Sequence, residues 1–252
     1  MPSDTSAITW QDPSVSLPFI APILRTLRQE VGSGATVLGF VGTPWTLAAY
    51  SVEGGADKDC HATKQMMFHQ PQLLHALLGH LTDALGVYVC HQIDCGAQVI
   101  QLFDSWAHHL SPSQFAEFSL PYAERLMAAV RAKHPNTPLI FHANGSAGKE
   151  ALMATCTADV LGWDWSTDMA VARQQCGAGR VLQGNVDPQV LFGPHEAITA
   201  AVSACMASAG RKHILNVGHG VPQGTPEENV AVFVNAARNT AYPARKAAPA
   251  GR

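Results

Sequence analysis

The pattern of apolar residues along the chain predicts six short β-strands. Each is a brief, nearly unbroken run rich in Val, Ile, Leu and Phe, which is typical of a parallel strand that is buried on both faces. The runs are separated by stretches in which helices can form. The predicted strands span Thr36–Val41, Ala97–Phe103, Leu139–His142, Asp159–Trp163, Arg180–Gln183 and His213–Val217.

Helical patterns occupy several of the stretches between the strands. They show apolar positions at helical spacing, prolines where the first residue of a helix favours them, or capping-box sequences of the form Ser/Thr-x-x-Glu/Gln. Alternating strands and helices predict a parallel α/β fold. Helices are expected over Leu17–Val31, Pro44–Val52, Pro71–Cys95, from Ser111 toward His134 and from Thr225 to Asn239.

The residues that follow the strands favour a barrel over a doubly wound sheet. Every predicted strand ends in a polar or glycine cluster, and in a (β/α)8 barrel all such ends meet at one mouth. A doubly wound sheet would place its ligand at one switch point, usually beside a Gly-rich fingerprint. The chain has no Gly-x-Gly-x-x-Gly sequence and no P-loop. The clusters are Gly42-Thr43, Asp104-Ser105, His142-Ala143-Asn144, Asp164-Trp165-Ser166, Gly184-Asn185 and Gly218-His219-Gly220.

Length and composition agree with one large domain. With 252 residues and no Gly/Ser/Pro-rich linker, residues 1–252 are expected to form a single domain with a core over about 17–240. Residues 242–252, rich in Ala, Pro and basic side chains, are expected to fray. Hydrophobic residues make up 47% of the chain and charged residues only 14%, which excludes a disordered chain and predicts a hidden subunit interface.

Charge and hydropathy exclude two classes of partner. The formal net charge is −3 and basic residues form no stripe, so nucleic-acid binding is not expected. The uncharged stretch Val31–Ser51 contains four glycines and Pro44, which indicates strand, turn and helix rather than a membrane span. No signal peptide is visible after Met1. The protein is therefore expected to be soluble.

The cysteines do not predict a metal site. Six cysteines are scattered through apolar surroundings without Cys-x-x-Cys spacing, so they are expected to be reduced, buried thiols. A zinc interpretation of Cys60-His61 or of Cys90-His91 with Cys95 lacks a second ligand pair at finger-like spacing. We expect no metal there.

Three polar side chains near strand ends are candidates for chemistry. Tyr50 lies on the helix after the first strand, where a core aromatic with its hydroxyl at the rim is an equally good interpretation. Ser105 directly follows a strand and Asp104, although serine at such a turn is most often a helix cap. His219 stands between two glycines that would let the backbone approach a ligand, which singles it out among twelve histidines.

Five long motifs make the chain similar to a known family. The runs GFVGTPWTLAAYSVEGG (39–55), QLFDSWAHHLSP (101–112), LGWDW (161–165), LQGNVDPQVLFG (182–193) and HILNVGHG (213–220) resemble uroporphyrinogen decarboxylases. The similarity extends from about Leu17 to Ala237. The sequences GNVDP…LFG (184–193) and GTPEENV (224–230) look closest to the plant, algal and cyanobacterial branch.

The resemblance implies a function and a set of site residues. Family members remove CO2 from the four acetate side chains of uroporphyrinogen III, giving coproporphyrinogen III, on a TIM barrel and without a cofactor. By motif, Tyr50, Ser105 and His219 match substrate-binding polar residues, and Phe40 and Phe103 match apolar residues that line the cleft. The resemblance also implies a homodimer, located in the plastid stroma of a plant or alga or in the cytoplasm of a bacterium.

The chain departs from the family at its start. The family begins with a segment containing Arg-Gln-Ala-Gly-Arg-Tyr and a strand ending in Ser-Asp, whose aspartate contacts the pyrrole NH groups; this sequence has neither motif. A barrel incomplete at the N-terminus, without its first strand, is therefore expected, and no catalytic residue is assigned. No arginine stands at a strand end and Lys149 is the nearest cation, so eight substrate carboxylates would lack partners. Turnover by this chain alone is expected to be negligible.

Two other functions remain open from the sequence. Zinc-dependent corrinoid methyltransferases of the same superfamily carry His-x-Cys at a strand end, where this chain has His142-Ala143-Asn144. Zinc content distinguishes that reading from a decarboxylase. A non-catalytic interaction protein built on a degraded barrel would keep dimerisation and lose porphyrinogen binding.

Overall fold

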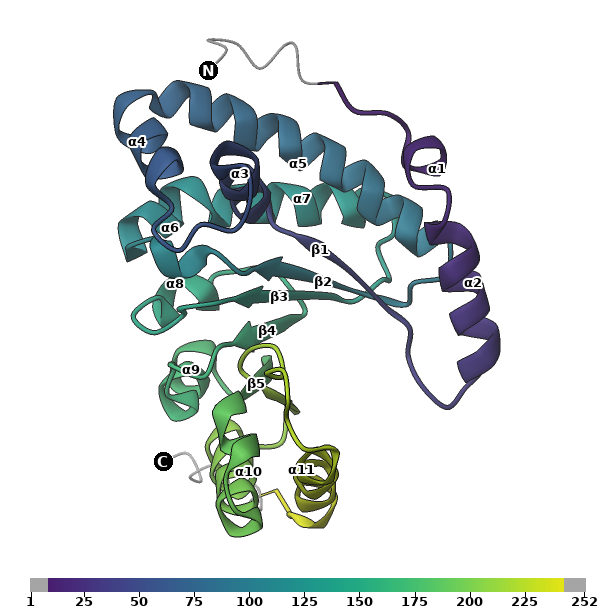
Figure 1. The fold of residues 1–252 in the computed structure, drawn as a ribbon, viewed down its shortest axis with the longest axis vertical. Helices are drawn as coiled ribbons and strands as arrows, with labels where there is room; N and C mark the ends of the chain where they lie inside the picture. The colour runs from purple at the N-terminus through teal and green to yellow at the C-terminus, as the bar shows by residue number, and fades with distance from the viewer. Residues whose placement is uncertain (1–8, 243–252) are drawn as a thin grey trace, which may run out of the picture.

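The computed structural model, which describes residues 9–242, contains one parallel β-sheet in sequential strand order (Figure 1). Each strand pairs with the next one along the chain, so the order never reverses. A doubly wound sheet would reverse at a switch point, whereas a β/α barrel keeps this order. The strands are β1 Leu38–Gly42, β2 Val99–Asp104, β3 Leu139–Ala143, β4 Val160–Trp163, β5 Val181–Val186 and β6 His213–Val217.

The two faces of the sheet differ in chemistry. Leu102, Phe141, Leu161 and Leu182 are paired in one row across β2 to β5, and all four are fully buried. The neighbouring row runs through Phe103, His142, Gly162 and Gln183 and ends at Ile214. Because side chains alternate between faces along a strand, the first row packs on the helices and the second faces the barrel interior.

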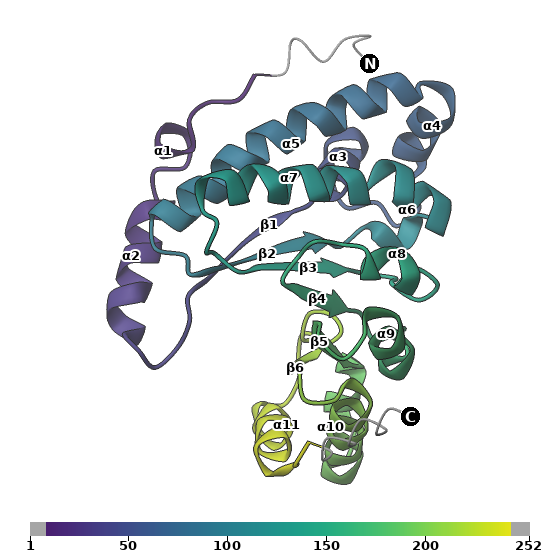
Figure 2. The same cartoon turned by 180° about the vertical axis from the view of Figure 1, so that it is seen from behind.

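Helices cover the outer face of the sheet. Figures 1 and 2 show α5 and α7 side by side over the sheet, with α10 and α11 packed together near β5 and β6. The helices are α1 Pro13–Ser16, α2 Ile20–Val31, α3 Pro44–Glu53, α4 His61–His69, α5 Pro71–Asp94, α6 Pro112–Phe118, α7 Leu120–Lys133, α8 Glu150–Ala154, α9 Met169–Cys176, α10 His195–Ala209 and α11 Glu227–Asn239, with 3₁₀ turns η1 Ala107–His109 and η2 Pro188–Phe192.

The parallel α/β fold and all six predicted strands are confirmed, and one capping prediction is wrong. Ser111 forms the expected capping box with Gln114 at the start of α6. Thr225 caps nothing: its hydroxyl donates to the Pro222 carbonyl oxygen at 2.8 Å, and Pro226 is the N-cap of α11 without a side-chain hydrogen bond. A local turn therefore competes successfully with the cap. Helices α1, α4, α8, α9 and α10 had no predicted counterpart. The frayed tail expected from residue 242 onward lies, apart from Tyr242, outside the described residues.

The sheet is an open arc rather than a closed barrel. Within residues 9–242, β1 pairs only with β2 and β6 only with β5, whereas a (β/α)8 barrel has eight strands. Leu38, Phe40 and Ile214 on these edge strands are 40%, 62% and 44% exposed. Beside β1 lies a second hollow of about 390 Å³, lined mainly by apolar side chains that include Trp10, Phe40 and Tyr88. The incomplete barrel expected from the sequence is what the described residues form.

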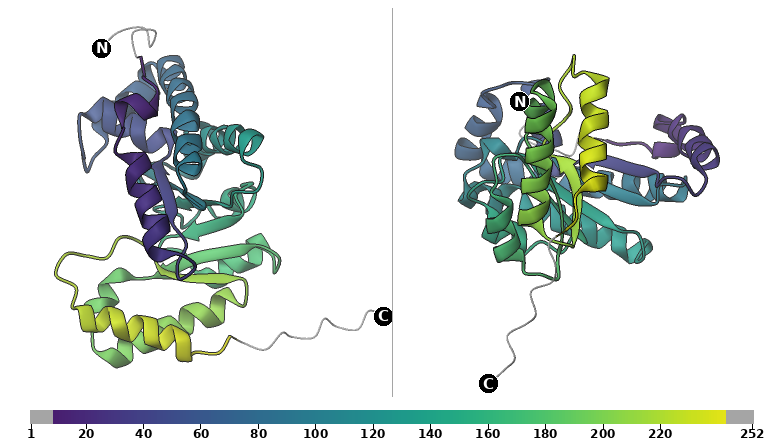
Figure 3. Two further views of the ribbon diagram at one scale, coloured as in Figure 1. Left: turned by 90° about the vertical axis from the view of Figure 1, so that its right-hand side faces the viewer. Right: turned by 90° about the horizontal axis from the view of Figure 1, so that it is seen from below.

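Helix α5 has the length and apolar composition that a membrane span requires. It is the one such helix in residues 9–242. Its buried face packs against α7 and α3, which is the usual place of an apolar core helix (Figure 3).

Candidate functional site

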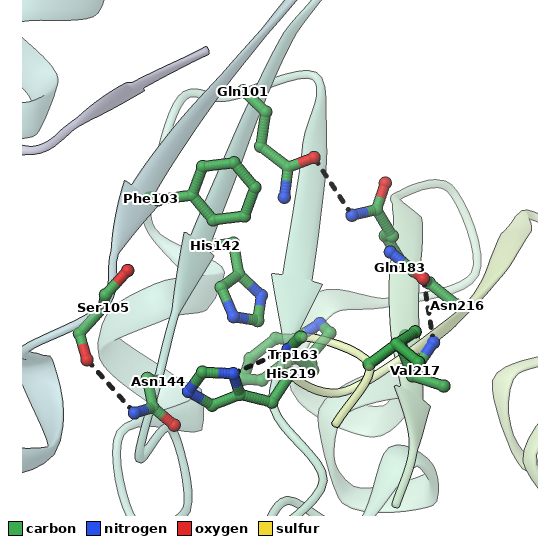
Figure 4. Close-up of a pocket in the computed structure, with 13 residues that line it drawn as sticks. Gln101, Phe103, Ser105, His142, Asn144, Trp163, Gln183, Asn216, Val217 and His219 are labelled. Carbon is green, nitrogen blue, oxygen red and sulfur yellow. Dashed lines mark hydrogen bonds between the residues drawn. The ribbon is translucent and has the colours of Figure 1, made fainter. Parts of the chain in front are cut away.

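A cavity of about 400 Å³ opens at the carboxyl ends of the strands (Figure 4). Three of the five residues expected to bind substrate, Phe103, Ser105 and His219, line it together. Its wall is formed by side chains and backbone from β2 to β6 and the loops that follow them. The other lining residues are Gln101, His142, Asn144, Trp163, Gln183, Gly184, Asn216, Val217, Gly220 and Val221.

The other two expected residues lie next to the cavity and do not line it. Phe40 packs edge-to-face on Phe103, with ring centroids 6.1 Å apart, and faces the hollow beside β1. Tyr50 packs on Trp106 at 5.0 Å, and its ring is 40% exposed. Phe40 therefore borders the cavity through Phe103, whereas Trp106, the neighbour of Tyr50, does not line it.

Hydrogen bonds to its main chain hold Ser105 in place. Its carbonyl oxygen accepts hydrogen bonds from Asn144 Nδ2 at 3.1 Å and from His108 Nδ1 at 3.0 Å. Its hydroxyl is not the helix cap that the sequence also allowed, since among the described residues it makes no hydrogen bond. The hydroxyl is thus available to a ligand in the cavity.

Asp104 is a buried anchor directly before Ser105. Its carboxyl group is fully buried and accepts hydrogen bonds from the hydroxyls of Thr43 at 2.7 Å, Thr46 at 2.9 Å and Ser119. Burial raises the pKa of this carboxyl, while the three hydroxyl donors act in the opposite direction. The group ties the end of β2 to the start of α3 and to α7, and so fixes the loop that carries Ser105.

His142 stands at the centre of the cavity wall, between Phe103 and His219 (Figure 4). Its ring packs edge-to-face on Phe103 with centroids 5.8 Å apart. Gly162 lies opposite it on β4, and a Cβ there would come within 3.0 Å of His142 Nδ1. Burial lowers the pKa of His142 to about 4, so the ring is neutral at pH 7.

The two glycines beside His219 differ: Gly220 lines the cavity, as a glycine that admits a ligand should, and Gly218 does not. A Cβ at Gly218 would overlap the backbone of Trp165, so this glycine permits two loops to pack closely rather than a ligand to approach. Gly220 has open space around it, and its amide donates to His219 Nδ1 at 2.6 Å. A neutral His219 in this arrangement carries its proton on Nε2.

The carboxylate of Asp164 organises the loops after β3 and β4. Asp164 accepts hydrogen bonds from the amides of Gly145 and Ser146, at 2.9 and 3.1 Å, and from the Ser146 hydroxyl at 2.7 Å. Burial alone would raise the pKa of Asp164, but these hydrogen bonds outweigh it and hold the pKa below its usual range. Lys149 donates to the Gly145 carbonyl oxygen at 2.5 Å and does not line the cavity.

The sequence analysis missed two glutamines within the strands. Gln101 and Gln183 are each 5% exposed, and Gln183 Nε2 lies 3.4 Å from Gln101 Oε1 across the cavity. The available signal was a polar residue inside an otherwise apolar strand, because a buried amide needs a partner. His142 and Asn144 were noted as part of a strand-end cluster and in the comparison with a zinc motif, but not as substrate-binding residues.

The cysteine and histidine pairs do not assemble into a metal site in residues 9–242. No group of three or more His, Cys, Asp or Glu side chains is arranged to hold a metal ion there. Burial raises the pKa of the Cys60 thiol to about 11, and it also raises the pKa of Cys90. Both thiols are therefore protonated at neutral pH, and a metal binds the thiolate form.

Known proteins resemble the chain over nearly its whole length. Residues 1–240 match the family described as uroporphyrinogen decarboxylase (URO-D). The uroporphyrinogen decarboxylase of Picosynechococcus sp. is 51% identical over 238 residues, covering 94% of this chain and 68% of that protein. Uroporphyrinogen decarboxylase 2, chloroplastic, of Arabidopsis thaliana is 49% identical over 231 residues, covering 91% and 59%. The chain spans about three fifths to two thirds of the length of these relatives.

A solved structure agrees on the fold. A methyltransferase from Methanosarcina mazei superposes with a TM-score of 0.81 over 94% of this chain and 69% of its own, at 22% sequence identity. At that identity the likeness concerns the fold alone and gives no support to methyl transfer. The match of the family to residues 1–240 and the identity of about half to its members lead to one conclusion. The chain belongs to the uroporphyrinogen decarboxylase family.

Proposed function

We propose that this chain provides the strand-end part of a uroporphyrinogen decarboxylase site, which binds the porphyrinogen for removal of CO2 from its acetate side chains. The observation that carries the proposal is the cavity in which Phe103, Ser105 and His219 meet. Membership of the family supports the substrate class. The continuous sheet supports treating residues 1–252 as one domain of this kind.

The chemistry requires a positioned pyrrole. A pyrrole protonated at carbon becomes an iminium group, which accepts the electron pair released when the neighbouring acetate loses CO2; the electron sink lies in the substrate, and we propose no cofactor. In this site Phe103 and Trp163 offer apolar surface to a pyrrole, while Ser105, Asn144 and His219 offer donors to its carboxylates. Such groups act by holding the acetate and ring in one orientation.

The cavity has no fixed positive charge within the described residues. Neither arginine nor lysine is among the lining residues, and Lys149 is engaged with Gly145. Carboxylates are recognised most strongly by arginine, which binds them through two parallel hydrogen bonds. The proposed site therefore depends, for full activity, on the arginines and the aspartate that the family carries in its N-terminal motifs.

Binding of coproporphyrinogen III tests the proposed function. Ser105→Ala and His219→Gln should each weaken the affinity by about 10- to 150-fold, because each removes a hydrogen bond to a charged group worth roughly 1.5–3 kcal/mol. Anaerobic titration calorimetry measures this, with His61→Gln on exposed α4 as the matched control. Absence of binding, or equal affinity in all four proteins, would overturn the proposal.

Assembly is a separate prediction. We expect a homodimer, as the resemblance implies, and the low charged fraction of 14% agrees with a surface hidden between subunits. Sedimentation velocity at protein concentrations from about 1 to about 50 µM should show a dimer at the highest concentration. A stable monomer throughout would contradict it.

The compartment follows the source of the chain. The relatives include a chloroplastic plant protein and several from cyanobacteria. We propose the plastid stroma for a plant or algal source and the cytoplasm for a bacterial one, without a membrane or nucleic-acid partner.

A further inference from the structure

Among residues 9–242, the ionisable side chains in the cavity lining are His142 and His219. A ligand with several carboxylates that enters it meets amides, hydroxyls, aromatic rings and these two imidazoles. Transfer of a carboxylate out of water is costly unless a positive charge or several hydrogen bonds replace the solvent. An imidazole is therefore the kind of side chain in this lining that can supply a positive charge.

His142 is placed to receive an acceptor. It is 8% exposed, and its imidazole makes no hydrogen bond to any of the described residues. Gly162 leaves the space that the ring occupies, since a Cβ at position 162 would lie 3.0 Å from the His142 side chain. Trp163 lines the same cavity, and its fully buried Nε1 has no hydrogen-bond partner among the described residues. Buried polar groups without partners are rare, and a bound ligand or water can satisfy them.

We propose that His142 receives a carboxylate of the ligand and takes up one proton from solvent as the ligand binds. The imidazolium N–H then donates to the carboxylate, which stays ionised, and no covalent bond is made or broken. This assignment rests on the proposed function for the identity of the natural ligand, a porphyrinogen with acetate side chains. It adds a binding residue, His142, and a proton linkage that none of the motifs indicated.

The charges around His142 favour this uptake once an anion is present. Directly after β4, Asp164 attracts a protonated His142, whereas a positive charge on His219, on the loop after β6, would repel it. On β2, Asp104 is occupied by three hydroxyls, and Lys149 on the loop after β3 interacts with both carboxylates. Burial dominates in the empty cavity, so the pKa of His142 is about 4. An opposite charge within about 4–6 Å raises a pKa by about 1–3 units.

The sign of the pH dependence follows from these values. The bound state holds the proton more tightly than the free state, so affinity is greatest at low pH and declines as pH rises through the bound-state pKa. With a bound pKa of about 6, linkage predicts an uptake of about 0.7 proton at pH 5.5 and binding about fourfold tighter at pH 5.5 than at pH 7.5.

The test is calorimetric titration with coproporphyrinogen III and, separately, pyrrole-3-acetate, in buffers of different ionisation enthalpy. The proton uptake of the wild-type chain should exceed that of His142→Gln by about 0.7 at pH 5.5, on the linkage just given, while His61→Gln matches the wild type. Subtracting the variant removes protons exchanged by the ligand and by His219. Equal uptake in wild type and His142→Gln would overturn the proposal.

The two ligands separate this inference from the proposed function. Uptake at His142 with pyrrole-3-acetate but no binding of coproporphyrinogen supports the carboxylate site and contradicts the proposed substrate. Coproporphyrinogen binding without proton uptake at His142 supports the proposed substrate and contradicts the role of His142. If neither ligand binds, both proposals are overturned. Thermal melting shows whether His142→Gln is folded. If it is not, the ¹⁵N chemical shifts of the wild-type imidazole give the answer. His142 should change from neutral to protonated on ligand addition at pH 5.5, and no change contradicts the proposal.

Discussion

The chain on its own should form coproporphyrinogen at no more than about one hundredth of the rate reached when the family's N-terminal segment is fused ahead of Met1. Removing one preorganised electrostatic partner typically costs about 10²–10³ in rate. Here the family's aspartate and its arginines are both missing from the sequence given, and the cavity supplies no fixed cation in their place. Anaerobic conversion of uroporphyrinogen III, followed by chromatography of the oxidised products, measures the difference.

A matched control separates chemistry from folding in that experiment. The fused segment should be prepared a second time with the aspartate of its Ser-Asp motif changed to asparagine. We expect this version to reduce self-association through the open edge of β1, because it covers the exposed Leu38 and Phe40, without restoring turnover. A bare chain as active as the fused protein would show that the described cavity is sufficient for catalysis.

Asp104→Ala should lower the free energy of unfolding by about 3 kcal/mol or more. The change leaves the hydroxyls of Thr43, Thr46 and Ser119, all buried, without their acceptor, and each unsatisfied buried group costs about 1–3 kcal/mol. Urea denaturation followed by circular dichroism measures the loss. Asp59→Ala, on an exposed side chain, is the control and should stay within about 0.5 kcal/mol of the wild type.

Asp104→Asn distinguishes the hydrogen bonds from the charge. The amide oxygen can accept from the two threonines while Nδ2 donates to Ser119 Oγ, so the network survives. Because burial raises the pKa of Asp104, the folded protein favours the protonated carboxyl group. This group contributes most to stability below the unfolded-state pKa and progressively less as pH rises through the folded-state pKa. The Asn variant should therefore gain stability relative to the wild type between pH 4 and pH 7. A growing disadvantage over this range would show that the ionised carboxylate is the favoured form.

The strands could be predicted from the sequence because helices cover them on one side and the barrel interior encloses them on the other. Leu102, Phe141 and Leu161 are wholly buried, so the apolar runs that contain them are unmistakable. Helix α10 escaped detection because its residues are mostly alanine, serine and other small side chains, which give a weak amphipathic contrast. Thr225 shows a different limit. Its hydroxyl could accept from a backbone amide of the helix or donate to the Pro222 carbonyl oxygen, and the sequence does not say which bond forms.

The site could be predicted in part for the same physical reason. Ser105 and His219 follow strands directly, and parallel strands bring their carboxyl ends together. Phe40 faces the hollow on the open side of β1, and Tyr50 packs on Trp106 outside the cavity lining; no local motif contains this placement. The role of His142 depends on the space above Gly162 of a neighbouring strand, and this pairing becomes visible only once the strand register is known.

A crystal structure of the chain with coproporphyrinogen III tests the central claim most directly, namely that the strand-end cavity is the porphyrinogen site. We predict density for a pyrrole ring against Phe103, with a carboxylate in hydrogen-bonding distance of both His142 and His219 and a second one near Ser105. The hollow beside β1, lined by Trp10, Phe40 and Tyr88, is of similar size and offers a clear alternative. A tetrapyrrole found in that hollow, with the strand-end cavity empty, would contradict the account.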